Sequence, residues 1–307
     1  SFIAAEQPDV VQTWLYHADV LGTLATVPRT RTRLVWNIRN SGLEESHRLT
    51  WRLLVRSSAL LSRFVDCIVS NSVAGMEYHQ RVGYRPPRWE LVPNGWVPAR
   101  SVPSPLERAA ARARFGLAED AFLVGFPARR ARQKDHPTFF AGARMVGARA
   151  PRMRFVLFGA HLDSSALASE PALADAATTG RIIVMGEIKN VEELLPALDC
   201  VTLTSSHGEG LPNAVGETMA AGLPVVATDV GDVRSLVDGA GIVAPARDPR
   251  ALADAWIRLS ELGSEGCISL GERGRRRIAE QYSLDLMVER YQSLYELLVG
   301  DKHRKLP

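Results

Sequence analysis

Residues 200–228 form the segment that most constrains the fold of this chain. An apolar run at 200–204 is followed by a Gly-Leu-Pro-Asn turn at 210–213, a helix of small residues at 212–221 and a second apolar run at 223–228. Pro212 falls in the first helical turn, and Gly222 falls where a C-cap glycine belongs. The order strand, helix, strand is typical of a parallel βαβ unit, so the segment predicts an α/β fold.

Two glutamates flank this turn, Glu209 before the predicted helix and Glu217 inside it. A helix N-terminus offers unpaired backbone N–H groups and the positive end of a dipole, which suit a phosphate. Ionised carboxylates accept hydrogen bonds from hydroxyl groups, which suits a polyol. The pattern therefore predicts a site for a nucleotide sugar. The alternative is a pair of surface charges on an ordinary helix.

The other apolar runs indicate two domains and a terminal helix. In the second half the predicted strands are 122–126, 155–159, 182–185, 200–204, 225–228 and 241–243, with helices between them. In the first half, short apolar runs at 9–15, 33–39 and 66–70 flank a helical stretch at 49–64. Prolines at 98, 103 and 105 break regular structure and indicate a linker. We expect domains at 1–98 and 99–283, and an amphipathic helix within 284–307.

A basic loop follows the predicted strand 122–126 and contains Arg129 and Lys134. The carboxyl ends of parallel strands share one edge of a sheet, so this loop and the Glu209 loop should face one ligand. Fixed cations neutralise the negative charge of a diphosphate. The alternative is a solvated basic loop.

Two features of the first half have a functional and an ordinary interpretation. His17 follows the run 9–15, where a general base could stand, and it could equally cap the next helix. Arg48, Arg52, Arg56 and Arg63 recur at steps of four, four and seven, which places them on one helical face beside several leucines. A basic amphipathic helix can lie on an anionic membrane, and it can also be a helix with one solvated face.

The composition excludes several classes of protein. The 37 Lys and Arg residues are offset by 34 Asp and Glu, and a net charge of +3 does not indicate nucleic acid binding. Cys67, Cys200 and Cys267 form no C-x-x-C pair, which gives no metal or redox motif and fits a reducing, cytosolic compartment. No apolar run approaches the roughly 20 residues that span a bilayer. The chain begins without Met in helix-like sequence, so we expect part of a longer protein.

These motifs resemble those of the retaining glycosyltransferases of family 4 (group 1). Residues 209–217 resemble the family's E-x7-E motif, residues 128–136 its G-R-x4-K-x-H segment, and residues 92–95 its interdomain P-N-G. The resemblance covers nearly the whole chain and implies the GT-B fold, in which two Rossmann-like parallel-sheet domains face a cleft. It also implies that the last helix crosses back toward the first domain.

The resemblance assigns a role to each matching residue. Arg129 and Lys134 would hold the donor diphosphate, Glu209 the hydroxyls of the transferred sugar, and Glu217 the ribose. The backbone at Gly210, Leu211, Pro212 and Asn213 would face sugar and phosphate, and the loop of Gly186 and Ile188 would lie near the base. Glu209 and His17 are the catalytic candidates.

The implied reaction moves a sugar from a UDP- or GDP-sugar to a saccharide or lipid-linked acceptor, with the anomeric configuration kept. It would need no metal or cofactor, and it would serve bacterial envelope or exopolysaccharide synthesis in the cytoplasm or at the inner membrane face. The alternatives are a nucleotide-sugar-binding module without turnover and a nucleotide-sugar epimerase on the same fold.

The chain departs from the family pattern in its first half. It starts past the family's Gly-rich loop, so we expect an incomplete N-terminal domain. Trp14 stands where the family often has a histidine, and Val97 stands where it usually has an acidic residue.

Overall fold

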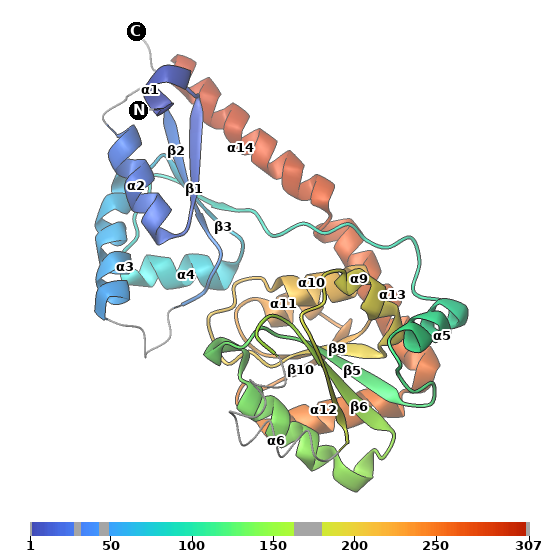
Figure 1. The fold of residues 1–307 in the computed structure, drawn as a ribbon. Helices are drawn as coiled ribbons and strands as arrows, with labels where there is room; N and C mark the ends of the chain where they lie inside the picture. Colours follow the sequence, from blue (N-terminus) through green and yellow to red (C-terminus); the bar gives the residue numbers. More distant parts are fainter. Residues whose placement is uncertain (1, 28–31, 43–48, 163–179, 305–307) are drawn as a thin grey trace. The chain divides into compact units, whose positions relative to one another are not determined.

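The structure is a computed structural model that describes residues 2–27, 32–42, 49–162 and 180–304. It divides into two compact units, each with its own parallel sheet (Figure 1). The first unit contains residues 1–95, 207–211 and 284–307, and the second contains residues 96–206 and 212–283. The predicted α/β class is confirmed for both units.

The first unit is a four-stranded sheet with helices on both faces. Its strands are β1 (Val10–Trp14), β2 (Arg33–Ile38), β3 (Cys67–Ser70) and β4 (Trp89–Leu91), paired in that order and all parallel. Its helices are α1 (Phe2–Glu6), α2 (Tyr16–Thr26), α3 (Leu49–Leu61), α4 (Val73–Val82) and α14 (Leu284–Arg304). Strand β4 was not predicted, because its three residues include a glutamate and are too few to show a pattern.

The side chains of β2 alternate between the two faces of this sheet. Leu34, Trp36 and Ile38 pack with residues of α3 and α4 on one face. Val35 packs with Leu294 of α14 on the other. On that second face, Asn37 of β2 donates from Nδ2 to the Tyr291 hydroxyl at 2.6 Å. The predicted terminal helix therefore forms part of the core of the first unit.

The second unit is a six-stranded parallel sheet with strand order β10-β9-β8-β5-β6-β7. The strands are β5 (Phe122–Pro127), β6 (Met153–Phe158), β7 (Ile182–Gly186), β8 (Cys200–Leu203), β9 (Val225–Thr228) and β10 (Gly241–Ala244). All six were predicted within two residues of these bounds. The sequence predicts these strands because most side chains of the central strands are buried on both faces of the sheet. Each such strand is therefore a continuous apolar run.

The helices of the second unit cover both faces of its sheet. They are α5 (Pro105–Arg114), α6 (His136–Val146), α9 (Val191–Leu194), α10 (Asn213–Ala220), α11 (Val233–Val237), α12 (Pro249–Glu261) and α13 (Gly263–Gln281). One core cluster joins the sheet to α6 and α12 through Phe139 and Trp256, and another joins it to α5 and α9 through Leu194. Helices α5, α11 and α13 were not predicted.

The proline-containing segment 97–104 lies against the second unit as extended chain without helix or strand. The N–H of Ala99 donates to the Ala220 carbonyl at the end of α10, at 2.8 Å. A Cβ on Gly222 would lie 2.7 Å from a methyl of Val102, and Gly222 has φ +76, as a C-cap glycine requires. The segment is therefore packed along α10.

The three cysteines are free thiols buried in strand and helix interiors: Cys67 in β3, Cys200 in β8 and Cys267 in α13. Loss of water around the thiol raises the pKa of Cys67 to about 12 and that of Cys267 to about 11. All three are protonated in the native protein at neutral pH.

Helix α2 buries an acid in the first unit. Asp19 is 1% exposed and accepts a hydrogen bond from the Thr13 hydroxyl of β1 at 2.5 Å. Burial raises the pKa of Asp19 from 3.8 to about 7, and the Thr13 hydrogen bond opposes this rise. The folded state therefore holds this proton more tightly than the unfolded chain does.

We predict that Asp19→Asn stabilises the protein selectively at high pH. Because the pKa is raised on folding, wild-type stability is lost as the pH rises from about 4 to about 7, on the order of 4 kcal/mol in total. Asparagine stays neutral and can still accept from Thr13. Urea unfolding at roughly pH 8 should show a larger unfolding free energy for the variant, and at roughly pH 4 the two proteins should be close.

Glu77→Gln is the matched control, since Glu77 is an exposed acid on α4 of the same unit. It should change stability little at either pH. An equal effect of Asp19→Asn at both pH values would show that folding does not raise the pKa of Asp19.

Candidate functional site

The predicted donor residues of the second unit lie in loops at one edge of its sheet. Every strand pair in this sheet is parallel. The loops after β5, β6, β7 and β8 therefore share the carboxyl edge, where open α/β sheets bind ligands. Arg129 and Lys134 follow β5, Gly186 ends β7, and Ile188 follows it.

Two hydrogen bonds join the loop after β5 to the loop after β8. The buried Thr204 hydroxyl donates to the Lys134 carbonyl at 2.7 Å. The Ser206 N–H donates to the Gln133 carbonyl at 2.9 Å. The basic loop is therefore fixed, through its backbone, to the chain that leads into α10.

The loop after β5 carries four cationic residues, namely Arg129, Arg130, Arg132 and Lys134. The three arginines are exposed, and Lys134 is half-buried. The acid of this loop, Asp135, has φ 48 and caps α6, where its carboxylate accepts from the Thr138 N–H at 3.3 Å and the Thr138 hydroxyl at 2.7 Å. Since this carboxylate is used in the cap, the loop presents a net positive charge.

Gly159 brings the ends of β5, β6 and β7 together. A Cβ at this position would lie 2.5 Å from the Ala128 carbonyl oxygen, directly before Arg129, and Gly159 has φ +144. The Gly159 N–H donates to the Gly186 carbonyl at 2.8 Å. Only glycine fits this close approach, which places the loop of Gly186 and Ile188 beside the start of the basic loop.

Helix α10 begins at Asn213, with Pro212 immediately before it in extended conformation. The sequence analysis began this helix at Pro212, one residue too early. The fixed φ of proline suits both the first helical residue and the residue before it, so the sequence does not distinguish the two. No side chain caps this helix end. The first-turn N–H groups of an uncapped helix suit an anion. The ring of Pro212 is buried, so this residue offers a ligand only its backbone.

Glu217 lies on the exposed side of α10. Partial loss of water, followed by the negative charge of Glu192 on α9, raises its pKa. Two carboxylates from different helices therefore lie near each other at this edge. Such an arrangement suits a ligand that supplies hydroxyl donors.

Glu209 is grouped with the first unit, in the segment His207–Leu211. Its side chain is buried, and its backbone forms an antiparallel bridge with Asn40 and accepts a hydrogen bond from the Ser41 hydroxyl. A Cβ on Gly210 would lie 2.6 Å from Asn71 Oδ1, so Gly210 permits close packing. Glu209 and Glu217 thus belong to different units.

An amide-rich network at the carboxyl ends of β2, β3 and β4 was not identified from the sequence. Asn94 Oδ1 accepts from Asn71 Nδ2 at 3.2 Å and from the Arg39 guanidinium, while Asn94 Nδ2 donates to the Leu211 carbonyl at 3.0 Å. Asn94 belongs to the P-N-G motif. Arg39 and Asn71 could have been found because each directly follows a strand.

The catalytic candidate His17 lies in the first turn of α2 with its side chain exposed. Its ring meets the Trp51 ring edge to face, with centroids 5.1 Å apart. The N-cap residue of α2 is Leu15, and no side-chain cap is formed. The expected capping by His17 is therefore not observed.

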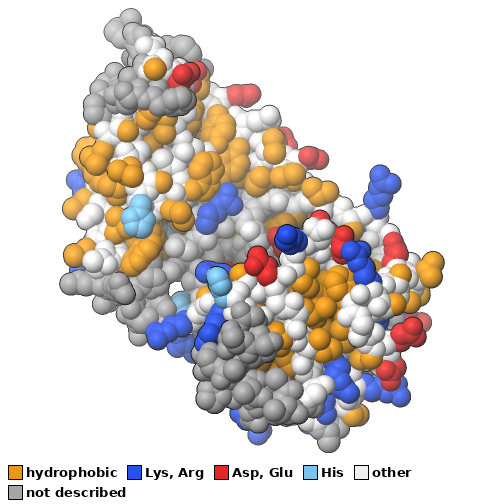
Figure 2. Space-filling view, in the orientation of Figure 1, with side chains coloured by type: hydrophobic (Ala, Val, Ile, Leu, Met, Phe, Trp, Pro, Cys, Tyr) orange, Lys and Arg blue, Asp and Glu red, His pale blue; other side chains and the backbone are white. Residues whose placement is uncertain are grey.

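The sequence analysis proposed a basic face on the helix that contains α3. Arg56 and Arg63 of this face are exposed. Arg48 and the side chain of Arg52 lie outside the described residues. Leu53, Leu60 and Phe64 are more than half exposed on the same face, at 51%, 63% and 56%. Figure 2 shows hydrophobic side chains gathered where α2 and α3 lie. Within the described ranges, no helix is long and apolar enough to cross a membrane.

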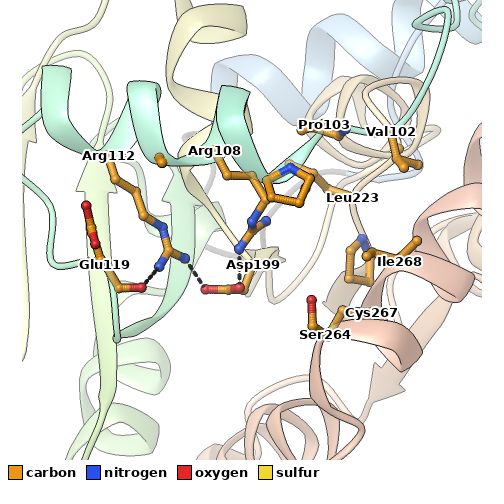
Figure 3. Close-up of a pocket in the computed structure, with 14 residues that line it drawn as sticks. Val102, Pro103, Arg108, Arg112, Glu119, Asp199, Leu223, Ser264, Cys267 and Ile268 are labelled. Atoms are coloured by element: carbon orange, nitrogen blue, oxygen red, sulfur yellow. Dashed lines mark hydrogen bonds and ion pairs between the residues drawn. The ribbon is translucent and has the colours of Figure 1, made fainter.

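A cavity of about 290 Å³ lies at the opposite, amino-terminal edge of the second sheet (Figure 3). Arg108 and Arg112 of α5 both bind the Asp199 carboxylate, at 2.5 and 2.7 Å. Arg112 also donates to the Ala197 carbonyl at 2.9 Å. These groups hold α5 on the sheet, and none of the predicted site residues lines this cavity.

Family models match both halves of the chain. A model described as "Glycosyl transferase 4-like domain" matches residues 1–95, and one described as "Glycosyl transferases group 1" matches residues 121–261. The second match contains Arg129, Lys134, Glu209 and Glu217.

Individual relatives agree with the family models. The chain is 26% identical to the putative glycosyltransferase EpsD of Bacillus subtilis over 82% of its own length and 67% of the relative's. It is 29% identical to the lipopolysaccharide core biosynthesis mannosyltransferase LpsB of Rhizobium meliloti, over 41% of the chain and 37% of the relative. The chain thus spans two thirds of the first relative's length and little more than a third of the second's.

The fold matches solved structures along nearly the whole chain. HepE of Anabaena, crystallised in complex with UDP, superposes with a TM-score of 0.82 at 20% identity, covering 97% of this chain and 80% of that one. At this identity the match shows the fold, and it confirms the predicted GT-B architecture. The chain belongs to the group 1, family 4-like glycosyltransferases.

Proposed function

We propose that this chain transfers a sugar from a UDP- or GDP-sugar to an acceptor hydroxyl in bacterial envelope or exopolysaccharide synthesis. The observation that carries the proposal is the backbone link between the basic loop and the strand that leads into α10, through Thr204 and Lys134. The link puts fixed cations and an uncapped helix N-terminus at one sheet edge. Two similar proteins support the proposal. LpsB is a lipopolysaccharide core biosynthesis mannosyltransferase, which supports a role in envelope synthesis, and HepE was crystallised with UDP, which supports a UDP-sugar donor.

The donor diphosphate is the group that this edge suits best. In the transfer, the bond from the anomeric carbon to the diphosphate oxygen breaks, a bond to the acceptor oxygen forms, and the acceptor hydroxyl loses its proton. Negative charge therefore grows on the leaving diphosphate. Arg129, Lys134 and the first turn of α10 would stabilise that charge without a metal ion or cofactor.

The two glutamates would bind different hydroxyl groups of the donor. Glu217 lies on α10, whose N-terminus would hold phosphate, so we assign it to the ribose. Glu209 precedes the helix, and we assign it to the transferred sugar, with retention of the anomeric configuration. The loop of Gly186 and Ile188, next to Glu192, would lie near the base. For His17 we propose no step, because its exposed ring packs on Trp51.

We predict that Glu217→Gln and Glu209→Gln affect binding differently. Glu217→Gln should weaken bare UDP or GDP about tenfold or more, because a charge-assisted hydrogen bond to ribose is lost. Glu209→Gln should leave the bare nucleotide unaffected and weaken the nucleotide sugar. Isothermal titration calorimetry with nucleotide and nucleotide sugar measures both effects.

Glu261→Gln is the control, an exposed acid at the end of α12. If wild-type protein binds neither UDP nor GDP, the proposed function is wrong. Binding without acceptor-dependent sugar transfer would instead favour a binding module without turnover. Release of an epimerised nucleotide sugar without acceptor would favour an epimerase.

We further propose that the acceptor is lipid-linked and that α2 and α3 contact the inner face of the membrane, with the protein otherwise in the cytoplasm. Helix α2 buries Asp19 and Thr23 and exposes Leu21 and Leu24, so its apolar side faces outward. Helix α3 adds exposed leucines and Arg56. Among residues 16–26 and 49–64 the single acid is the buried Asp19. An apolar surface with cations and no exposed acid suits an anionic lipid surface.

We predict that Leu60→Ser combined with Phe64→Ser abolishes binding to vesicles that contain phosphatidylglycerol. Flotation with and without the anionic lipid measures this binding. Leu106→Ser is the control, since Leu106 is an 80% exposed leucine on α5 of the second unit. Wild-type protein that does not float with anionic vesicles would refute the membrane contact and leave the donor site unaffected.

A further inference from the structure

Trp96 packs on the helix that carries Glu217 at a distance that only glycine permits. Its side chain is 7% exposed. A Cβ built on Gly216 of α10 would lie 2.2 Å from Cε2 and Cζ2 of the Trp96 ring. Any other residue at 216 would displace either the ring or the helix. Trp96 and Gly216 are therefore complementary in size.

Helix α10 depends on this packing for its position. It has eight residues, a glycine in its interior and no side-chain cap at its start. Glycine is a poorer helix former than alanine, and short helices derive most of their stability from tertiary packing. Helix α13 and the sheet supply part of that packing. The linker supplies the rest, with Trp96 at Gly216, the Ala99 N–H at the Ala220 carbonyl, and Val102 at Gly222.

Trp96 is itself fixed by the end of α13. Its N–H donates to the Tyr282 carbonyl at 2.9 Å, and the two rings have centroids 6.3 Å apart. Trp96 also forms a parallel bridge with Ser283. Trp96 is the first residue of the second unit and Ser283 is the last, so this bridge joins the two ends of that unit.

We propose that Trp96 is a positioning residue for the nucleotide site: its ring sets helix α10 and thereby the direction of Glu217. The inference rests on the proposed function, in which Glu217 binds ribose. Trp96 lies in the linker, outside the E-x7-E motif and the basic loop, so it is an additional residue of the proposed nucleotide site. Trp96 acts through α10 and makes no contact with substrate.

The test changes the size of the contact. Gly216→Ala inserts a methyl group where the Trp96 ring lies, and it should weaken UDP or GDP at least about tenfold, comparable to losing one charge-assisted hydrogen bond. The double variant Trp96→Phe with Gly216→Ala makes room for that methyl group and keeps an aromatic ring against α10. It should recover a substantial part of the affinity, a rescue that general destabilisation would not produce. Calorimetry with UDP and GDP gives each affinity, and circular dichroism verifies folding.

Gly142→Ala is the matched control. Gly142 of α6 also packs on a tryptophan ring in the second unit, with a Cβ 3.1 Å from Trp256. This variant should lower the unfolding temperature and keep nucleotide affinity. If Gly216→Ala does not fold, Trp96→Phe serves instead, because the smaller ring should loosen α10 and weaken the nucleotide while the protein stays folded.

Each outcome is decisive. Weakened binding in Gly216→Ala or Trp96→Phe, with recovery in the double variant and none of the loss in Gly142→Ala, supports the inference. Unchanged affinity in Gly216→Ala and Trp96→Phe, or equal losses in Gly142→Ala, overturns it. Wild-type protein that binds neither nucleotide overturns the proposed function itself, a separate result.

Discussion

Parallel strand pairing in the second sheet is the constraint on which the candidate site depends. Because six strands run in one direction, the loops after β5, β6, β7 and β8 must emerge at one edge. Hydrogen bonds then fix these loops to one another, from the Thr204 hydroxyl to the Lys134 carbonyl and from the Gly159 N–H to the Gly186 carbonyl. The side chains of Arg129 and Glu217 need not hold the site together, and they remain available for a ligand.

The two edges of this sheet use charge in opposite ways. At the amino-terminal edge, Arg108 and Arg112 share the Asp199 carboxylate, which also accepts from the Leu123 N–H at 2.7 Å. These charges are satisfied inside the protein and fix α5. At the carboxyl edge, the carboxylate of Asp135 is used in a helix cap, and the three arginines of its loop are exposed. Charge at one edge builds the fold, and at the other it is presented to solvent.

The sequence predicted those strands and helices whose burial leaves an apolar pattern in the sequence. Strands such as β8 and β9 are continuous apolar runs because both of their faces are covered, and the motif residues follow them directly. Helix α13 was missed because two of the five residues on its buried face are glycines, Gly271 and Gly274, which weaken the apolar periodicity. Trp96 and Gly159 were missed as site residues because their role depends on a contact with a residue far away in the sequence. Such contacts leave no local pattern.

The buried thiols give each unit its own internal reporter. Cys67 lies in the sheet of the first unit, and Cys200 and Cys267 lie in the second. Cys67 and Cys200 have no exposed surface, and burial raises the pKa of both, so neither accessibility nor ionisation allows a thiol reagent to react with them in the native protein. Modification of either cysteine therefore requires opening of the unit that contains it. Labelling resolved by residue can separate the opening of the sheet that carries the proposed donor site from that of its neighbour.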